Sequence, residues 1–457
     1  MTDFPADLID RLHTFGQKHV LHGSDKLHPQ QRSEFVTQLA SINVHELQEL
    51  IAKANQPAQP PKSQRIAPLP TAPITATPQE RMIGEDSLRR GEVAALIVAG
   101  GQGSRLGFEK PKGMYPVGVV SGASLFQVHA EKLLAISRRY GKPVPFLVMT
   151  SPVTDAETRD YFHENRYFGL NKHDVIFFQQ GTMPAVCAKS GRLLLDAPGK
   201  LALSPNGHGG TITALAERGL LTELRSRGVK HVYYFQVDNP LLKICDPDFT
   251  GRHIATQSEA SSKVVFKERP EEKVGVFALL DGQCGMIEYS DLPKDLAAER
   301  EPTGELRFRA GNPAIHMFTL DFLERITSSG GLPYHVARKA ITHFDPEVGS
   351  VVSPANELNG LKFERFIFDA LPLANRWLAV QTSRSEEFSP LKNATGDDSP
   401  ETVRAAQLAL HSAWLAHAEV PTHGHDIEIS PLFALDAEEL KRKIPPGFAI
   451  TGPTEMR

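Results

Sequence analysis

The sequence has few cysteines and no spacing that would pair them. Its 457 residues include only Cys187, Cys245 and Cys284, which lie far apart, and no CxxC pair is present. A zinc site and a disulfide framework are therefore not expected, and the count is typical of the reducing cytosol. The 18 histidines form no HExxH motif or other clustered ligand spacing, which argues against a zinc hydrolase.

Long apolar segments and a basic excess are also missing. No uncharged apolar stretch approaches the roughly 20 residues that span a bilayer, and the N-terminus has no apolar signal-peptide core. Lys and Arg number 50 against 54 Asp and Glu, a net charge of −4. A general nucleic-acid binder would normally be basic, but a local basic pocket for a small anion remains compatible with this balance. We predict a cytoplasmic protein that binds neither membrane nor nucleic acid; the sequence gives no prediction of oligomeric state.

The chain is long enough for two or three domains, since domains typically have roughly 100–200 residues. Residues 1–55 carry three stretches with apolar side chains at helical spacing. Residues 57–78 contain seven prolines, which favours an extended linker or a strap over the surface. We assign residues 1–85 to an N-terminal helical segment with a proline-rich tether and expect no chemistry there.

From residue 86 onward, short apolar runs alternate with amphipathic stretches. "EVAALIVAG", "PVPFLVMTS", "VIFFQQG" and "HVYYFQVDN" are typical of buried parallel strands. Helical patterns separate them, including residues 209–228, which we predict as one helix. After about residue 260 the pattern is strand-rich, with "MIEYSDLP" among the predicted strands. We predict an α/β domain over residues 86–390, with a mixed sheet covered by helices on both faces, and a small C-terminal lobe over residues 391–457.

The most informative segment is "LIVAGGQGSRLGFEKPKGMYPVG", where a predicted strand runs into several glycines. Ligands of open α/β sheets bind beyond the carboxyl ends of strands, and glycines let main-chain N–H groups approach a phosphate or a base. The dinucleotide fingerprint fails because Leu106 stands at its third glycine, and the Gly-Lys-Ser/Thr ending of a Walker loop is absent. Cations beside N–H donors favour a triphosphate over a plain tight turn. The predicted phosphate loop contains Gly100, Gly101, Gly103, Arg105, Gly107, Lys110 and Lys112.

Two further turns follow predicted strands. Asp238 and Asn239 end "YYFQVDN", where a carboxylate can hold Mg²⁺ together with phosphate oxygens. The alternative is an Asp that caps the next turn, but a phosphate loop in the same sheet favours the metal. Residues 204–210, "SPNGHGG", precede a helical pattern. This turn suits an approaching anion or base, although a purely structural turn is equally compatible with it.

Together these motifs resemble the eukaryotic-type UDP-N-acetylglucosamine pyrophosphorylases, within the UTP:sugar-1-phosphate uridylyltransferases. The glycine-rich loop matches the family signature, with Ser104 where threonine is usual, and "FFQQGTMPA" is similar to the uracil-contact segment. The segments "SPNGHGG", "VDNPLLKICDPDFTG", "GNPAIHMFTLDFL", "GLKFERFIFDA" and "FSPLKNATGDD" follow in the family's order. The resemblance covers nearly the whole chain and implies a Rossmann-like nucleotidyltransferase core.

The resemblance also implies a reaction. UTP and a hexosamine 1-phosphate, N-acetylglucosamine 1-phosphate above all, would give a UDP-sugar and pyrophosphate in the presence of Mg²⁺. Such a transfer needs no protein nucleophile, because the sugar phosphate attacks the α-phosphorus and the protein positions and stabilises the anions.

The resemblance assigns a role to individual residues. Arg105 and Lys112 would bind the triphosphate and the departing pyrophosphate, and Lys392 would reach the α-phosphate. Asp238 would hold Mg²⁺. The expected contacts to the base and sugar are Gln180, Gly207 and the main chain near Gly100 and Gly101 for uracil, Glu288, Tyr289 and Asn312 for the sugar hydroxyls, and Phe366 and Phe368 for the N-acetyl group.

Residue patterns alone leave alternatives to several of these roles. From the residue pattern alone, Lys392 could be a surface lysine and Gln180 could cap the end of a strand. Tyr289 could be an ordinary aromatic residue of a strand. Phe366 and Phe368 alternate with polar neighbours, so they also fit one face of a core strand.

The chain departs from the family pattern at two positions. His208 stands where asparagine is usual, and UDP-glucose and broad UDP-sugar pyrophosphorylases tend to carry histidine there. A histidine can donate to a phosphate or sugar oxygen. Phe266 stands where an acidic residue is common. These departures keep a UDP-glucose or broad-specificity pyrophosphorylase as the alternative function and a non-catalytic nucleotide-sugar-binding protein as a more remote one. An NAD-dependent dehydrogenase is disfavoured by the missing third glycine.

Overall fold

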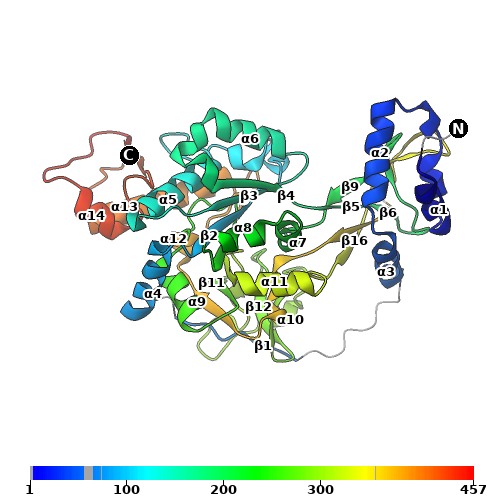
Figure 1. The fold of residues 1–457 in the computed structure, drawn as a ribbon. Coiled ribbons are helices and arrows are strands. Elements are labelled where there is room, and N and C mark those ends of the chain that lie inside the picture. Colours follow the sequence, from blue (N-terminus) through cyan, green and yellow to red (C-terminus); the bar gives the residue numbers. More distant parts are fainter. Residues whose placement is uncertain (1–3, 56–64, 74, 356) are drawn as a thin grey trace. The chain divides into compact units, whose positions relative to one another are not determined.

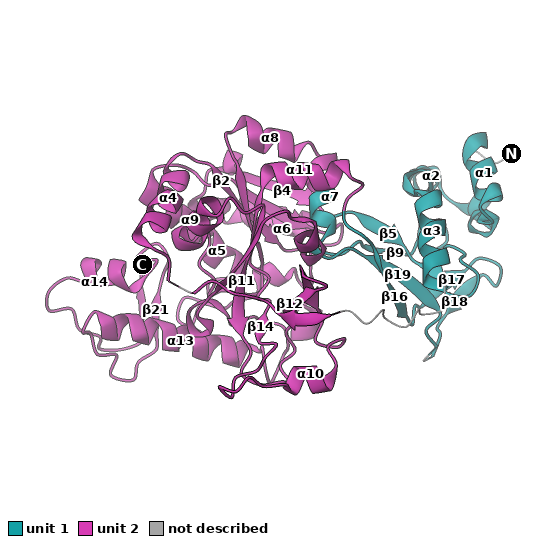
Figure 2. Cartoon of the chain, turned by 90° about the horizontal axis from the view of Figure 1, so that it is seen from below, with its two compact units in different colours: residues 1–63, 180–213, 332–367 teal, residues 64–179, 214–331, 368–457 magenta. Residues whose placement is uncertain are grey.

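The structure is a computed structural model that describes residues 4–55, 65–73, 75–355 and 357–457. The chain forms two compact units (Figure 2). The first contains residues 1–63, 180–213 and 332–367, and the second contains residues 64–179, 214–331 and 368–457. Each unit therefore gathers segments that are distant in the sequence. The domains predicted from the sequence, with boundaries at residues 86 and 391, are continuous stretches of the chain, and this division stays a prediction.

The first unit combines the N-terminal helices with short strands. α1 (Ala6–Thr14), α2 (Pro29–Ser41) and α3 (Val44–Asn55) confirm the three predicted helices. Phe35 and Leu39 of α2 share a core with Leu361 and Phe363. The strands form sheets in the orders β16-β19-β6, β18-β17-β7-β8 and β5-β9. Their bounds are β5 Thr182–Pro184, β6 Val186–Cys187, β7 Leu195–Ala197, β8 Lys200–Leu201, β9 Leu203–Pro205, β16 His335–Lys339, β17 His343–Asp345, β18 Ser350–Val352 and β19 Gly360–Glu364.

A mixed sheet forms the centre of the second unit, with the order β1-β12-β14-β11-β15-β10-β2-β3-β4. β10, β2, β3 and β4 are parallel, as the alternating pattern predicts, and β15 joins β10 antiparallel. β13 pairs with β12 and β20 with β11. The bounds are β1 Ile66–Pro68, β2 Val93–Val98, β3 Phe146–Thr150, β4 Val175–Gln179, β10 His231–Gln236, β11 Ala260–Phe266, β12 Val276–Leu280, β13 Gln283–Ile287, β14 Ala310–Gly311, β15 His316–Thr319 and β20 Trp377–Gln381.

Helices cover both faces of this sheet. Figure 1 shows α5 and α6 along one side of β2 and β3, and α8 and α11 along the other. Burial of strand side chains such as Phe146 and Phe235 against the helices supplies the main core. The helices that follow α3 along the chain are α4 Pro78–Arg89, α5 Leu125–Tyr140, α6 Asp155–Glu164, α7 Gly210–Glu217, α8 Leu220–Ser226, α9 Pro247–Ala255, α10 Lys294–Ala298, α11 Leu320–Ser328, α12 Arg384–Glu387, α13 Pro400–His417 and α14 Ala437–Lys443.

Three local predictions need correction or extension. The single helix predicted over residues 209–228 is wrong: α7 and α8 are separate, because Gly219 adopts a left-handed φ of 69°. The strand predicted in "MIEYSDLP" ends at Ile287. Part of the proline-rich segment is β1, which pairs antiparallel with β12 as an edge strand; residues 56–64 and 74 of that segment lie outside the described residues.

The C-terminal segment has a small core of its own. Leu415 of α13 packs with Leu440 of α14. β21 (Ile427–Ile429) and β22 (Thr454–Met456) form a parallel pair. Within the described part of the chain, no helix is long and apolar enough to cross a membrane.

Candidate active site

The glycine-rich loop follows β2 and folds back on itself. The Lys112 N–H donates to the Gly101 carbonyl at 3.1 Å, and the Gly103 N–H donates to Lys110 at 3.0 Å. A Cβ on Gly103 would lie 2.8 Å from the Phe108 side chain, whereas a Cβ on Gly101 would meet no atom within 4 Å. Packing therefore requires glycine at position 103 but not at position 101. A bare main chain at Gly101 is what a closely approaching ligand needs.

The cations of this loop differ in their surroundings. Gly100 leads into the loop from the carboxyl end of β2, as predicted. Arg105 lies on a short 3₁₀ turn, Ser104–Leu106, and is exposed, as is Lys110. Lys112 begins the next 3₁₀ turn, Lys112–Met114, and its side chain is only 17% exposed. The loop thus presents two exposed cations and one partly buried cation.

Lys112 meets the carboxylate predicted to hold a metal. Its Nζ lies 3.3 Å from Oδ2 of Asp238, although the two residues are 126 positions apart in the sequence. Asp238 follows the carboxyl end of β10, which pairs in parallel with β2. Adjacent parallel strands therefore deliver the phosphate loop and the acidic turn to the same edge of the sheet.

Lys392 belongs to a loop that is bonded to the same turn. The Leu391 N–H donates to the main-chain carbonyl of Asp238 at 2.8 Å. The Lys392 and Asn393 N–H groups both donate to Asp398, at 2.7 and 3.0 Å. The Lys392 Nζ lies 3.4 Å from Oδ2 of Asp398, and the side chain is 38% exposed. The hydrogen bonds bring the Lys392 backbone next to Asp238.

The three predicted sugar-hydroxyl contacts lie on one part of the second unit. The Asn312 N–H donates to the Gly275 carbonyl at 2.9 Å, and Asn312 Nδ2 contacts Met286 at 3.0 Å. A Cβ on Gly275 would lie 3.6 Å from the Glu288 carboxylate. Asn312 and Glu288 therefore flank Gly275. Tyr289 is 49% exposed and lies outside any strand.

The predicted uracil turn lies in the first unit. Gln180 is buried, and the neighbouring Gly181 carbonyl accepts the N–H of Asn206 at 3.0 Å. A Cβ on Gly207 would lie 2.4 Å from the carbonyl oxygen of Arg365. Only glycine fits this contact, so the turn is held against the chain after β19.

The ring of His208, in the same turn, packs against Phe366. Their ring centroids are 5.5 Å apart, and the Ile367 N–H donates to Nδ1 of His208 at 3.2 Å. In the neutral imidazole the proton is therefore on Nε2. Phe366 follows the end of β19, and Phe368 lies in the 3₁₀ segment Ile367–Leu373. The alternative of a core strand face through both phenylalanines is wrong.

The predicted residues fall into groups by unit. Gln180, Gly207, His208 and Phe366 belong to the first unit, and the others belong to the second. Within the second unit the structure brings Lys112, Asp238 and the Lys392 loop together, and it brings Glu288 close to Asn312. Among the described residues there is no group of three or more His, Cys, Asp or Glu side chains that could hold a metal ion.

A model of the family described as UTP–glucose-1-phosphate uridylyltransferase matches residues 44–419. This chain belongs to that family. It is therefore a uridylyltransferase, a nucleotidyltransferase, which confirms the predicted enzyme class and the resemblance.

Individual relatives agree with this assignment. UDP-N-acetylglucosamine diphosphorylase 2 of Arabidopsis thaliana is 34% identical over 95% of this chain and 90% of its own length. UDP-N-acetylglucosamine pyrophosphorylase of Saccharomyces cerevisiae is 36% identical over 93% of this chain and 94% of its own. The crystal structure of the corresponding Trypanosoma brucei enzyme, 27% identical, aligns with a TM-score of 0.84 over 100% of this chain and 99% of that chain. The predicted nucleotidyltransferase fold is thereby confirmed.

Three residues near Asp238 were assigned no role from the sequence. Asn239, Lys263 and Glu387 surround the Asp238 turn with buried polar contacts. One signal was available: Lys263 interrupts the apolar strand "SKVVF", and a lysine inside a buried strand needs a buried anionic partner. The identity of that partner depends on the fold.

Proposed function

We propose that this protein transfers the uridylyl group of UTP to N-acetylglucosamine 1-phosphate and releases pyrophosphate. The main support is that relatives named for this sugar align over more than nine-tenths of the chain. The grouping of Lys112, Asp238 and Lys392 at one edge of the sheet supplies charges suited to two phosphorylated substrates.

In the proposed reaction, a phosphate oxygen of the sugar 1-phosphate attacks the α-phosphorus of UTP in line. The new P–O bond forms as the bond to the bridging α–β oxygen breaks, and its electron pair leaves with pyrophosphate. We assign Arg105 and Lys112 to the triphosphate and the leaving pyrophosphate. We assign Lys392 to the α-phosphate, where negative charge has to be stabilised in the transition state.

We propose that Asp238 would hold Mg²⁺ when the nucleotide binds. Magnesium commonly uses one or two protein carboxylates and completes its shell with water and phosphate oxygens. A single carboxylate, 13% exposed and beside a phosphate loop, fits this mode of binding. The ion would neutralise charge on the phosphate oxygens.

We assign the remaining residues to recognition of the base and the sugar. Gly207 has no side chain, so its main chain can contact uracil. An apolar surface favours contact with the methyl group of the N-acetyl substituent. The proposed contacts are Gln180, Gly207, Gly100 and Gly101 for the uridine, Glu288, Tyr289 and Asn312 for the sugar hydroxyls, His208 for a phosphate or sugar oxygen, and Phe366 and Phe368 for the N-acetyl group.

A substrate panel tests this proposal. Pyrophosphate release from UTP is measured with N-acetylglucosamine 1-phosphate and glucose 1-phosphate. We expect kcat/KM to be at least about tenfold higher for the acetylated sugar, because the loss of one specific contact changes selectivity by about 10–200-fold. A preference for glucose 1-phosphate would favour the UDP-glucose or broad-specificity alternative, which His208 supports. Binding of both ligands without turnover would instead support a non-catalytic binding protein.

We also propose that the enzyme works in the cytoplasm. Cys187, Cys245 and Cys284 are all free thiols, which suits a reducing compartment.

A further inference from the structure

The side chain of Asn239 joins the turn that contains Asp238 to the segment that leads to Lys392. Asn239 is buried, and its Nδ2 donates to the Glu387 carbonyl at 2.6 Å. Its Oδ1 accepts the Ser389 N–H at 3.1 Å and the Leu241 N–H at 3.3 Å. Its amide therefore reaches both sides of Phe388, and with the bond from Leu391 to Asp238 it ties the turn to residues 387–391.

A buried ion cluster fixes the other side of this connection. Lys263, 2% exposed, donates to Glu387 at 2.7 Å and to Asp246 at 2.6 Å. Glu387 also accepts from the Thr382 hydroxyl at 2.5 Å and from the Lys243 N–H at 3.2 Å. Since burying three charged groups is costly, such clusters are weak contributors to stability. Their effect here is to hold Glu387 in one place.

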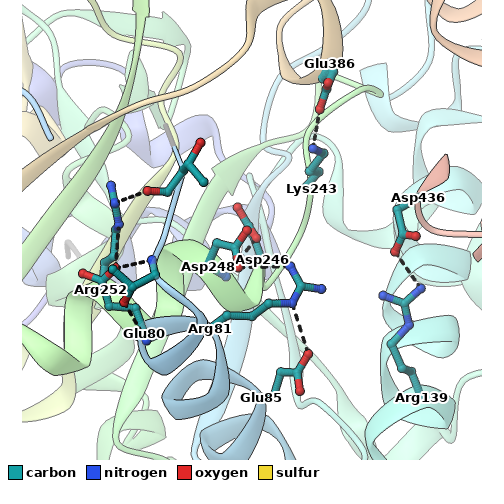
Figure 3. Close-up of polar contacts among 12 residues, drawn as sticks. Glu80, Arg81, Glu85, Arg139, Lys243, Asp246, Asp248, Arg252, Glu386 and Asp436 are labelled. Carbon is teal, nitrogen blue, oxygen red and sulfur yellow. Dashed lines mark hydrogen bonds and ion pairs between the residues drawn. The ribbon is translucent and has the colours of Figure 1, made fainter. Parts of the chain in front are cut away.

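Lys243 adds a second contact between the turn and α12. Its Nζ lies 2.5 Å from the carboxylate of Glu386. Figure 3 shows the two side chains pointing toward each other. Residues 238–246 are thus attached to residues 386–391 by the side chain of Asn239 and by that of Lys243. Beyond Lys392, Asp398 fixes the loop again.

None of Asn239, Lys263 and Glu387 is among the residues assigned to substrate. We propose that they form a clasp that sets the position of Lys392 relative to Asp238, with Asn239 as a positioning residue. This inference rests on the proposed roles of Lys392 and Asp238. A displacement of about 1 Å in such a group can reduce turnover by about 100-fold. The clasp would therefore act on kcat through Lys392.

A double-mutant cycle tests the inference. Asn239→Ala, Lys392→Ala and the double variant are assayed for kcat and for the KM of UTP, with folding checked by circular dichroism. We expect Asn239→Ala to lower kcat by about 10- to 100-fold and to leave KM within about twofold, because the lost interaction acts in the transition state. In the Lys392→Ala background, Asn239→Ala should change kcat by less than about twofold, since coupled residues are not additive.

Asn359 provides a matched control, because its amide also holds a main-chain segment. Its Nδ2 donates to the Ile341 carbonyl at 3.0 Å, and its Oδ1 accepts the Ile341 N–H at 2.7 Å. Asn359→Ala should lower the melting temperature without lowering kcat. If Asn239→Ala does not fold, Thr382→Val removes one bond to Glu387 and should give a smaller loss of kcat, again absent in the Lys392→Ala background.

The possible outcomes separate the two proposals. Wild-type turnover in Lys392→Ala would contradict the proposed site itself. A strongly reduced but measurable kcat in Lys392→Ala, combined with wild-type kcat in Asn239→Ala, or in Thr382→Val if that variant has to be used, would contradict only the clasp. The clasp would also be contradicted if the fold-reduction of kcat in the double variant equals the product of the reductions in the two single variants.

Discussion

At the scale of single residues, His208 is the position that we propose to affect the choice of sugar. Its ring packs against Phe366, and its Nδ1 accepts the Ile367 N–H. An asparagine is smaller, and its side-chain carbonyl can accept the same N–H. The two residues would therefore hold the turn alike but leave different space beside Phe366.

We predict that His208→Asn raises the preference for N-acetylglucosamine 1-phosphate over glucose 1-phosphate. The ratio of the two kcat/KM values should rise by about three- to tenfold, a change typical of a small difference in pocket shape. Competition assays with both sugars present measure the ratio directly. His335→Asn is the matched control, because the His335 ring packs against Phe366, with ring centroids 4.9 Å apart, but lies outside the turn. An unchanged ratio in His208→Asn would show that position 208 does not select the sugar.

At the scale of elements, Arg365 links α3 to the turn of residues 204–210, which we propose to bind uracil. Its guanidinium bonds to Thr213 at 2.9 Å and to Glu46 of α3 at 3.3 Å, and it stacks on Tyr334 at 4.0 Å. Its main chain donates to Asn206 at 2.7 Å. The N-terminal helices, expected to carry no chemistry, thus contact the residue that supports the turn.

We predict that Arg365→Lys destabilises the protein and raises the KM for UTP. Lysine keeps the charge but loses the planar stacking and the forked hydrogen bonds, so we expect a loss of about 1–3 kcal/mol. Glu46→Gln, which removes only one partly exposed ion pair, should cost less than about 1 kcal/mol. Denaturant unfolding and steady-state kinetics measure both effects. If Arg365→Lys and Glu46→Gln lower the free energy of unfolding equally, the ion pair alone accounts for the contribution of Arg365 to stability.

At the scale of the whole molecule, the C-terminal segment supports the loop that follows the phosphate loop. Glu428 accepts the N–H groups of Val120 and Ser121 at 2.7 and 2.8 Å. Arg139 of α5 lies 3.0 Å from Asp436, and Figure 3 shows this ion pair. These contacts explain why the C-terminal segment belongs to the same compact unit as the sheet, although it has its own small core.

Buried histidines should make the fold sensitive to mild acid. Burial lowers the pKa of His129 to about 3, and of His231 and His411 to about 4, from the ordinary value of 6.5. A nearby Lys132 also lowers the pKa of His129. As the pH falls below 6.5, the unfolded chain takes up these protons first. The stability that these histidines contribute is therefore fully present above about pH 6.5 and is lost as the pH falls from 6.5 to about 4 for His231 and His411, and to about 3 for His129.

We predict that His411→Asn flattens this decline. The asparagine amide can replace the donation of Nδ1 to the Ile427 carbonyl, at 3.1 Å, without adding a titrating group. Urea unfolding at pH 7 and pH 5 should show a smaller difference in the free energy of unfolding, by on the order of 1–3 kcal/mol. His423→Asn, at an exposed side chain, should leave the difference unchanged. If His411→Asn leaves the change in the free energy of unfolding between pH 7 and pH 5 unaltered, protonation of His411 does not contribute to the acid sensitivity.

The sequence predicted the strands and helices around the phosphate loop because their periodicity is local. It failed where one residue decides the path of the chain, as at Gly219, which separates α7 from α8. The alternative of a core strand face through Phe366 and Phe368, which the residue pattern left open, is wrong for a related reason. Alternation of apolar and polar residues also fits a turn with a 3₁₀ segment when tertiary contacts hold it.

The sequence by itself determined the family, the glycine-rich loop with its cations, and the acid that follows β10, since these are properties of short, ordered segments. Only the tertiary structure decided that Lys112 contacts Asp238 and that Asn239 and Lys263 hold the segment before Lys392. Such contacts join residues more than one hundred positions apart, and parallel strand pairing together with the burial of charged groups selects them. No local pattern specifies which distant strand end or loop will supply the partner.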